Sequence, residues 1–308
     1  MKTKIFIALA ILLFGVCASR TQAVELVKEL TYDQHTLSDI YPYGKVTREF
    51  QWDKIKEKLA QTDSLRTINS NSWAILQNKA NVHGQPPATQ EHQINEFKML
   101  TDKFGVEAAQ AIPLCLTDNL AAPYRYAYDG SLVKIIGQQD GFVIARTITF
   151  DGEYFIPKKY VHPIDSIPAF AKIIVVDRTN QNISTYEKVG NTWKIRSMNP
   201  ATTGAHNPPL QMRTPLGLFA LQKKLPKMYF YVDGTTEIGG YAPWANHFSA
   251  GGYIHGVPVN LPQTEIIEFS STLGTIPRSH MCVRNAASHS KFIYDNFPVN
   301  ETLIFVIE

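Results

Sequence analysis

The stretch Ser279-His280-Met281-Cys282-Val283-Arg284-Asn285 decides how this chain of 308 residues is interpreted, together with the earlier stretch Tyr253-Ile254-His255-Gly256. They supply a thiol and an imidazole. A thiol attacks an acyl carbon only as the thiolate, so a nucleophilic cysteine needs an imidazole or a helix amino-terminus that lowers its pKa. Asn285-Ala286-Ala287-Ser288, followed by apolar residues at helical spacing up to Phe297, predicts a capped helix just after Cys282. We therefore expect Cys282 to lie against the positive end of a helix dipole.

Four further stretches surround this pair in the chain. They are Lys172-Ile173-Ile174-Val175-Val176-Asp177, Thr202-Thr203-Gly204, Arg213-Thr214-Pro215-Leu216-Gly217-Leu218-Phe219 and the strand-like end Thr302 to Ile307. In this order the motifs resemble the catalytic domain of the L,D-transpeptidases (YkuD-type), which cross-link peptidoglycan through a cysteine nucleophile. The resemblance covers roughly residues 169–308. It implies a β-sandwich-like fold, and the strand-like runs 173–176, 183–189 and 193–198 independently predict a mostly-β domain with few helices.

The resemblance also implies roles for individual residues. Cys282 is the expected nucleophile and His255 the expected general base, which would form an ion pair with the thiolate. Ser279, His280 and Arg284 are expected to contact the substrate, since a guanidinium binds the carboxylates of a peptide stem bidentately. From the residues alone, the roles of His255 and His280 are interchangeable. We expect His206 and His289 to face solvent.

Two departures from the family pattern concern the site itself. Met281 stands where the family usually has glycine, so its side chain either crowds the acyl carbonyl or is accommodated by an adjusted backbone. There are 23 residues between His255 and Ser279, more than we associate with the family. The extra length includes Leu261 to Phe269, which predicts a short helix opened by proline and forms either a rim of the substrate groove or an ordinary surface insertion.

The first 23 residues predict an export signal. Lys2 and Lys4 precede an apolar run from Ile5 to Val16 that is too short to span a bilayer. A lipoprotein alternative would use Cys17, but Val16 stands where a small residue is expected. Removal of residues 1–23 leaves 27 basic and 27 acidic residues, a balance that gives no basis for nucleic-acid binding. We expect an exported protein of the periplasm or cell envelope, without a transmembrane span in the mature chain.

Two cysteines remain after export, Cys115 and Cys282. A disulfide between them is the alternative to a free nucleophile in an oxidising compartment. The apolar neighbours of Cys115 instead indicate a small buried residue. No cofactor is implied by the resemblance, and the histidines and cysteines lack the paired spacing of a zinc site.

The chain before residue 169 divides by its patterns. Residues 24–125 show two apolar stripes at helical spacing, one from Phe50 through Ile55 to Leu59 and one from Ile94 to Phe104, which predict a helical N-terminal region. Residues 126–165 show short alternating runs at 131–136, 142–150 and 154–161, which predict a small β-barrel. With Tyr154-Phe155-Ile156-Pro157 near its end, this segment resembles bacterial Src-homology-3-like domains.

The expected function is that of an L,D-transpeptidase in cell-wall biogenesis and cell shape, acting on peptidoglycan stem peptides. Cys282 would form an acyl-enzyme, and the amine of a second stem would take the acyl group to form a cross-link. Two alternatives remain open. One is an L,D-carboxypeptidase or related thiol hydrolase on the same fold; the other is a non-catalytic cell-wall-binding protein whose site Met281 has disabled.

Overall fold

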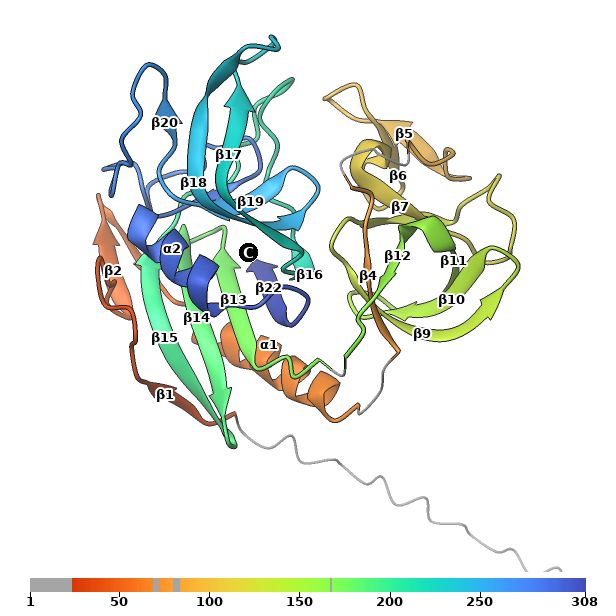
Figure 1. Ribbon diagram of the computed structural model, residues 1–308, viewed down its shortest axis with the longest axis horizontal. Coiled ribbons are helices and arrows are strands. Elements are labelled where there is room, and N and C mark those ends of the chain that lie inside the picture. Colours follow the sequence, from red (N-terminus) through yellow and green to blue (C-terminus); the bar gives the residue numbers. More distant parts are fainter. Residues whose placement is uncertain (1–23, 69–71, 80–83, 167) are drawn as a thin grey trace, which may run out of the picture.

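The computed structural model describes residues 24–68, 72–79, 84–166 and 168–308. They form two lobes that lie side by side (Figure 1). The large lobe contains residues 24–68 and 168–308, and the small lobe contains residues 72–79 and 84–166. The predicted export signal and Cys17 lie outside the described residues. In the described part of the chain, no helix combines the length and apolar character needed to cross a membrane.

A six-stranded mixed sheet is the centre of the large lobe. In spatial order its strands are β1 (Leu26–Lys28), β15 (Thr192–Pro200), β14 (Asn182–Val189), β13 (Lys172–Asp177), β22 (Thr302–Ile307) and β16 (Gly217–Ala220). β13, β14 and β15 form an antiparallel meander, and β22 pairs in parallel with β13. These strands confirm the four predicted between residues 173 and 307.

Side chains of the central strands alternate between two cores, because successive residues of a strand point to opposite faces of the sheet. On β13, Ile173 and Val175 belong to one core, whereas Ile174 and Val176 belong to the other. β22 repeats this alternation. The sheet is therefore buried on both faces, which explains why these strands are almost continuously apolar.

Helix α1 (Trp52–Arg66) covers one face of the central sheet and lies below it in Figure 1. Its buried side chains, Ile55, Leu59, Thr62 and Leu65, are three or four residues apart and so form one stripe. This helix confirms the first of the two predicted in residues 24–125.

A second sheet and the second helix cover the opposite face. The sheet contains β17 (Lys223–Tyr231), β18 (Ile238–Ser249), β19 (Gly252–His255) and β21 (Val283–Arg284), with β20 (Val259–Asn260) paired to β18. Helix α2 (Ala287–Asn296) packs against β18 and β19. Phe248, Ile254, Val283 and Ile293 share one core with the central sheet. The prediction of a mostly-β domain with few helices is confirmed.

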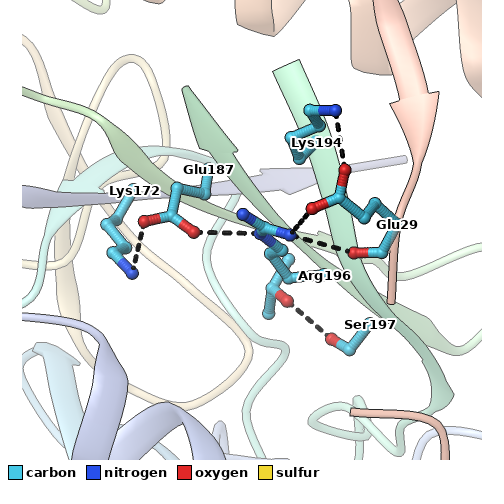
Figure 2. Close-up of polar contacts among 7 residues, drawn as sticks. Glu29, Lys172, Glu187, Lys194, Arg196 and Ser197 are labelled. Atoms are coloured by element: carbon cyan, nitrogen blue, oxygen red, sulfur yellow. Dashed lines mark hydrogen bonds and ion pairs between the residues drawn. The ribbon is translucent and has the colours of Figure 1, made fainter. Parts of the chain in front are cut away.

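Ion pairs next to the first strand stabilise its position at the edge of the central sheet. β1 runs parallel to β15, and the Glu29 carboxylate accepts hydrogen bonds from Lys194 at 2.7 Å and Arg196 at 2.8 Å. Arg196 also donates to Glu187 at 2.9 Å, so its guanidinium lies between two carboxylates (Figure 2). The bonds from Lys194 and Arg196 hold the pKa of Glu29 below its usual value. The hairpin of β2 (Ile40–Tyr43) and β3 (Val46–Glu49) follows in the chain.

The small lobe is built around a five-stranded sheet. Its strands are β11 (Glu153–Pro157), β10 (Phe142–Thr147), β9 (Leu132–Gln139), β4 (Trp73–Leu76) and β12 (Val161–Pro163). Two hairpins and two 3-10 helices complete it: β5 (His92–Ile94) with β6 (Leu100–Asp102), β7 (Ala111–Leu114) with β8 (Arg125–Tyr128), η1 (Ala108–Gln110) and η2 (Lys158–Tyr160). The predicted β-runs in residues 126–165 thus form strands, and their sheet also includes β4. The likeness to Src-homology-3-like domains stays a prediction.

The second helix predicted in residues 24–125 is wrong. The stripe from Ile94 to Phe104 forms the β5–β6 hairpin instead. The Asn95 side chain accepts hydrogen bonds from the amides of Phe97 at 2.9 Å and Met99 at 3.0 Å, which closes a turn where the helix was expected. Of the residues in 24–125 that the structure describes, only α1 and the short η1 are helical, and the others form strands and loops.

Candidate active site

Two paired strands bring the predicted nucleophile and base together. β19 ends at His255 and runs parallel to β21, with His255 opposite Arg284 and Ile254 opposite Val283. The Asn285 amide donates to the His255 carbonyl at 3.0 Å and extends this pairing. Cys282 immediately precedes β21, so its side chain enters the same region as that of His255.

Both side chains line a cavity of about 810 Å³. The β17–β18 hairpin supplies one wall, through residues such as Phe230 and Asp233, and Ser270, Thr272 and Leu273 supply another. Ser279, His280 and Arg284 also line it. All five predicted site residues therefore face one cavity, and every residue that lines this cavity belongs to the large lobe.

Cys282 is half-buried, and its thiol donates a hydrogen bond to the Gly251 carbonyl at 3.3 Å. Burial raises the pKa of the thiol to about 11, although the Tyr253 amide and the Arg284 charge act in the opposite direction. The thiol is therefore protonated in the resting site. Cys115 is buried and also free, so the disulfide alternative is wrong; burial raises its pKa to about 11 as well.

The expected stabilisation of Cys282 by a helix amino-terminus is wrong. α2 begins at Ala287, and its first amides bind Glu268: the Ala287 amide donates to the Glu268 carbonyl at 2.9 Å and the Ser288 amide to its carboxylate at 3.0 Å. A carboxylate is favoured there by the helix dipole. Glu268 belongs to the Leu261–Phe269 stretch, for which the predicted helix is wrong: it begins with a turn and contains no helix, and Glu268 contacts the start of α2.

His255 is buried and neutral. Its Nδ1 lies 2.7 Å from the Gly256 carbonyl oxygen, so the proton is on Nδ1 and the lone pair is on Nε2. Burial and, to a smaller extent, the nearby Arg284 charge lower the pKa of His255 to about 4, although the hydrogen bond to Gly256 acts in the opposite direction. Both shifts favour a neutral thiol beside a neutral imidazole over the expected ion pair.

Arg284 is half-buried with an unused hydrogen-bond donor. Its backbone pairs with Thr202 in both directions, at 2.8 Å each, while its side-chain Nε is buried and has no hydrogen-bond partner. Within the described ranges, no carboxylate lies in ion-pair range of its guanidinium. An unpaired cation beside the thiol matches the binding of an incoming carboxylate.

The other two predicted contacts differ from each other. Ser279 is buried, and its hydroxyl donates to the Cys282 carbonyl, so this side chain holds the loop in shape. His280 is exposed and lies 3.2 Å from the carboxylate of Asp233, which belongs to the β17–β18 turn and also lines the cavity. These contacts make Ser279 a residue of the loop's framework and His280 part of the cavity rim.

Met281 has a positive φ of 101°, a conformation that favours glycine. Its carbonyl accepts a hydrogen bond from the Thr214 hydroxyl at 2.6 Å. Its side chain is buried and lines a separate cavity between the two lobes, not the one that contains Cys282. The backbone around it is tightly packed, since a Cβ at Gly204 would lie 2.8 Å from the Met281 Cα. The backbone has therefore accommodated the methionine.

Several supporting residues were not predicted as site residues. The Thr202-Thr203-Gly204 and Arg213–Phe219 motifs pair with Ser279, Met281 and Arg284, and so shape the loop around the nucleophile. Gly251 and Tyr253 contact the sulfur through their backbones, for which a sequence carries no side-chain signal. His289, expected in solvent, is fully buried and bound to Ser197 at 2.8 Å. Within the residues that the structure covers, no group of three or more His, Cys, Asp or Glu is placed to hold a metal ion.

Comparisons with known proteins point in the same direction. Residues 171–306 match the family model of the YkuD L,D-transpeptidase catalytic domain. No curated protein matches the chain.

Solved structures with detectable similarity include a fused Zn-dependent amidase/peptidase/peptidoglycan-binding domain-containing protein from Clostridium acetobutylicum, at 19% identity and a TM-score of 0.31. That alignment covers 44% of this chain and 51% of the other, so the chain spans about half the length of that protein. An L,D-transpeptidase from Mycobacterium smegmatis is 15% identical over 57% of this chain and 82% of its own, with a TM-score of 0.36. L,D-transpeptidase 3 from Mycobacterium tuberculosis, solved with a faropenem-derived adduct, is 15% identical to this chain. The alignment covers 59% of this chain and 93% of the other, with a TM-score of 0.37.

The family match spans the strands and the loop that hold Cys282, His255 and Arg284. Residues 171–306 of this chain therefore match the family of L,D-transpeptidase catalytic domains.

Proposed function

We propose that this protein is a cysteine-dependent L,D-transpeptidase that cross-links peptidoglycan stem peptides in the cell envelope. The observation that carries the proposal is the shared cavity: the Cys282 thiol, the neutral His255 imidazole and the unpaired Arg284 guanidinium all open into it. A nucleophile, a base and a carboxylate-binding cation are the three groups that acyl transfer from a peptide stem requires.

Arg284 binds a carboxylate of the donor stem and places the scissile carbonyl near Cys282. In the resting site the thiol proton is hydrogen-bonded to the Gly251 carbonyl oxygen. It passes to Nε2 of His255 as the sulfur attacks the scissile carbonyl carbon of the donor stem. Burial raises the pKa of the thiol and lowers that of His255, which disfavours an ion pair before substrate binds, so the proton moves as the sulfur attacks. In the described part of the chain the Cys282 amide donates to no hydrogen bond, which leaves it free to bind the oxyanion.

The tetrahedral intermediate then collapses to a thioester. The carbon–nitrogen bond breaks, and the terminal D-amino acid leaves with the proton from His255. The amine of a second stem attacks the thioester, restores the thiol and forms the cross-link. Water in place of that amine would give the trimmed stem of a carboxypeptidase.

The test uses the purified chain with a disaccharide tetrapeptide, and mass spectrometry of the products. A cross-linked dimer supports the transpeptidase, and a trimmed monomer supports the hydrolase. If no product forms, the result supports a non-catalytic wall-binding protein. Cys282→Ala should abolish turnover, whereas the matched variant Cys115→Ala, which removes the other thiol outside the cavity, should retain it. A carbapenem should add its mass to the wild-type chain and not to Cys282→Ala. Substantial turnover by Cys282→Ala would remove Cys282 from the mechanism.

A further inference from the structure

The tight turn between β18 and β19 determines the surroundings of the Cys282 sulfur. Gly251 of this turn accepts the thiol hydrogen bond at 3.3 Å, and the amide of Tyr253, one residue into β19, donates to the sulfur. The turn also contains Ala250, whose φ of 45° lies in the left-handed region. A turn in this conformation persists only where neighbouring groups hold it.

Two of the side chains that hold this turn, Asp129 and Gln110, come from the small lobe. Asp129, which directly follows β8 and is 1% exposed, accepts hydrogen bonds from the Ala250 amide at 2.8 Å and from Gln222 Nε2 at 2.7 Å. Its second oxygen accepts the Asn78 amide at 2.7 Å. The side-chain oxygen of Gln110, also in the small lobe, accepts a hydrogen bond from the Gly251 backbone amide at 3.3 Å. Two consecutive amides of the turn are therefore bound by side chains from outside the catalytic-domain segment.

The contact between the lobes at this point is close. A Cβ at Gly130 would lie 1.9 Å from the Phe248 carbonyl oxygen, so the small lobe approaches β18 backbone to backbone. On the other side of the turn, His247 lies 2.7 Å from the Ala250 carbonyl and 3.8 Å from the Asp129 carboxylate. Burial lowers the pKa of His247, and its Nε2 donates a hydrogen bond to that carbonyl. Lys223 is the other charged group near this ring.

From this geometry we infer that Asp129 is a positioning residue for the Cys282 nucleophile, through its hydrogen bond to the β18–β19 turn. The inference rests on the proposed role of Cys282. It makes the small lobe a structural part of the active site, although no small-lobe residue lines the cavity that would receive the donor stem.

The Asp129→Asn variant keeps the side-chain shape but replaces one acceptor oxygen by an NH₂ group. Whichever way the amide is turned, its NH₂ group faces an N–H donor, either the Ala250 and Gln222 pair or Asn78. The turn then loses its fixed position, and displacements of about 1 Å at a nucleophile lower rates by up to roughly a hundredfold. We expect kcat for acyl transfer to fall about ten- to a hundredfold. KM should stay within about twofold, because the donor cavity is intact.

A second readout requires no peptidoglycan. Iodoacetamide alkylation of Cys282 is followed against pH, with peptide mass mapping to separate it from Cys115. Burial is the largest cause of the raised thiol pKa, so a loosened turn admits water and moves the alkylation midpoint to lower pH. The other groups around the thiol and the cavity rim, His255, Arg284, His280 and Asp233, are unchanged.

Asp102→Asn is the matched control. Asp102 is also a fully buried small-lobe carboxylate that binds three amides, those of Phe104, Val106 and Tyr126, but all three lie within the small lobe. It should lower the stability of that lobe and leave kcat and the Cys282 alkylation midpoint unchanged. If Asp129→Asn does not fold, Gln110→Ala, which removes the partly exposed contact to Gly251, should show the same two changes at smaller size.

Equal effects of Asp129→Asn and Asp102→Asn, or wild-type kcat and midpoint in both Asp129→Asn and Gln110→Ala, would overturn the inference. Failure of the proposed function looks different: Cys282→Ala would then keep its turnover, while the alkylation shift in Asp129→Asn would still report whether the turn is held by Asp129.

Discussion

Replacing Met281 by glycine tests how the chain accommodates a side chain where its family usually has none. Met281 is 7% exposed, has a φ of 101° and directs its side chain to the cavity between the lobes. Because that side chain does not line the Cys282 cavity, Met281→Gly should change kcat/KM for acyl transfer by about tenfold or less, which is about 1.4 kcal/mol in barrier.

The effect on stability comes from opposing contributions. Truncation of a buried methionine to alanine lowers the free energy of unfolding by about 2–5 kcal/mol. Replacing that alanine by glycine removes the Cβ from an unfavourable φ, which raises the free energy of unfolding by about 1–3 kcal/mol. The greater conformational freedom of glycine in the unfolded chain lowers the free energy of unfolding by about 0.5–1 kcal/mol and so offsets part of this increase. Both variants should therefore be less stable than the wild type, and Met281→Gly should be more stable than Met281→Ala by roughly 1 kcal/mol.

Urea unfolding of the wild type and the two variants measures these differences, and product analysis with the disaccharide tetrapeptide measures activity. Met281→Ala is the matched control, because it loses the same side chain and keeps the Cβ. A glycine variant no more stable than the alanine variant would refute the argument from backbone strain. If Met281→Gly switches on an otherwise inactive protein, the native chain is a wall-binding protein with a disabled centre and the proposed function is wrong.

Two further predictions concern the histidines. His255→Ala should lower the acyl-transfer rate by about 10²–10⁴, the usual effect of losing a general base. His280→Ala removes an exposed side chain at the cavity rim and should cost only a few-fold, so an inactive His280→Ala with a nearly normal His255→Ala would reverse the two roles. Stability should fall as the pH drops from 7 to 5, because burial lowers the pKa of His255 to about 4 and that of His289 to about 3, whereas the unfolded chain takes up these protons near pH 6.5. Each histidine contributes about 2 kcal/mol of that loss at pH 5. Urea unfolding at both pH values should show a smaller loss for His289→Gln, and an unchanged loss would contradict the assignment to this residue.

The sequence by itself predicted four of the six strands of the central sheet, β13, β14, β15 and β22, and the two residues that share the Cys282 cavity. β13 and β22 are short apolar runs bounded by turn residues, a local pattern that favours strands whatever surrounds them. Cys282 and His255 were predicted from the motifs that contain them, and the structure places both on the same cavity. The stripe from Ile94 to Phe104 was misinterpreted because one side chain, Asn95, closes a turn that apolar spacing does not reveal.

Only the tertiary structure decided the electrostatics of that pair. The pKa values of Cys282 and His255 move apart because the fold shields both groups from water, and this shielding depends on residues distant in the chain. The amino-terminus of α2 is occupied by Glu268, so it is not available to a thiolate. Met281 keeps a glycine-like φ because Thr214 binds its carbonyl from 67 residues away. Asp129 binds the amide of Ala250, in the turn beside the nucleophile, although the two residues are 121 positions apart in the chain. Such a contact arises only when the two lobes pack together.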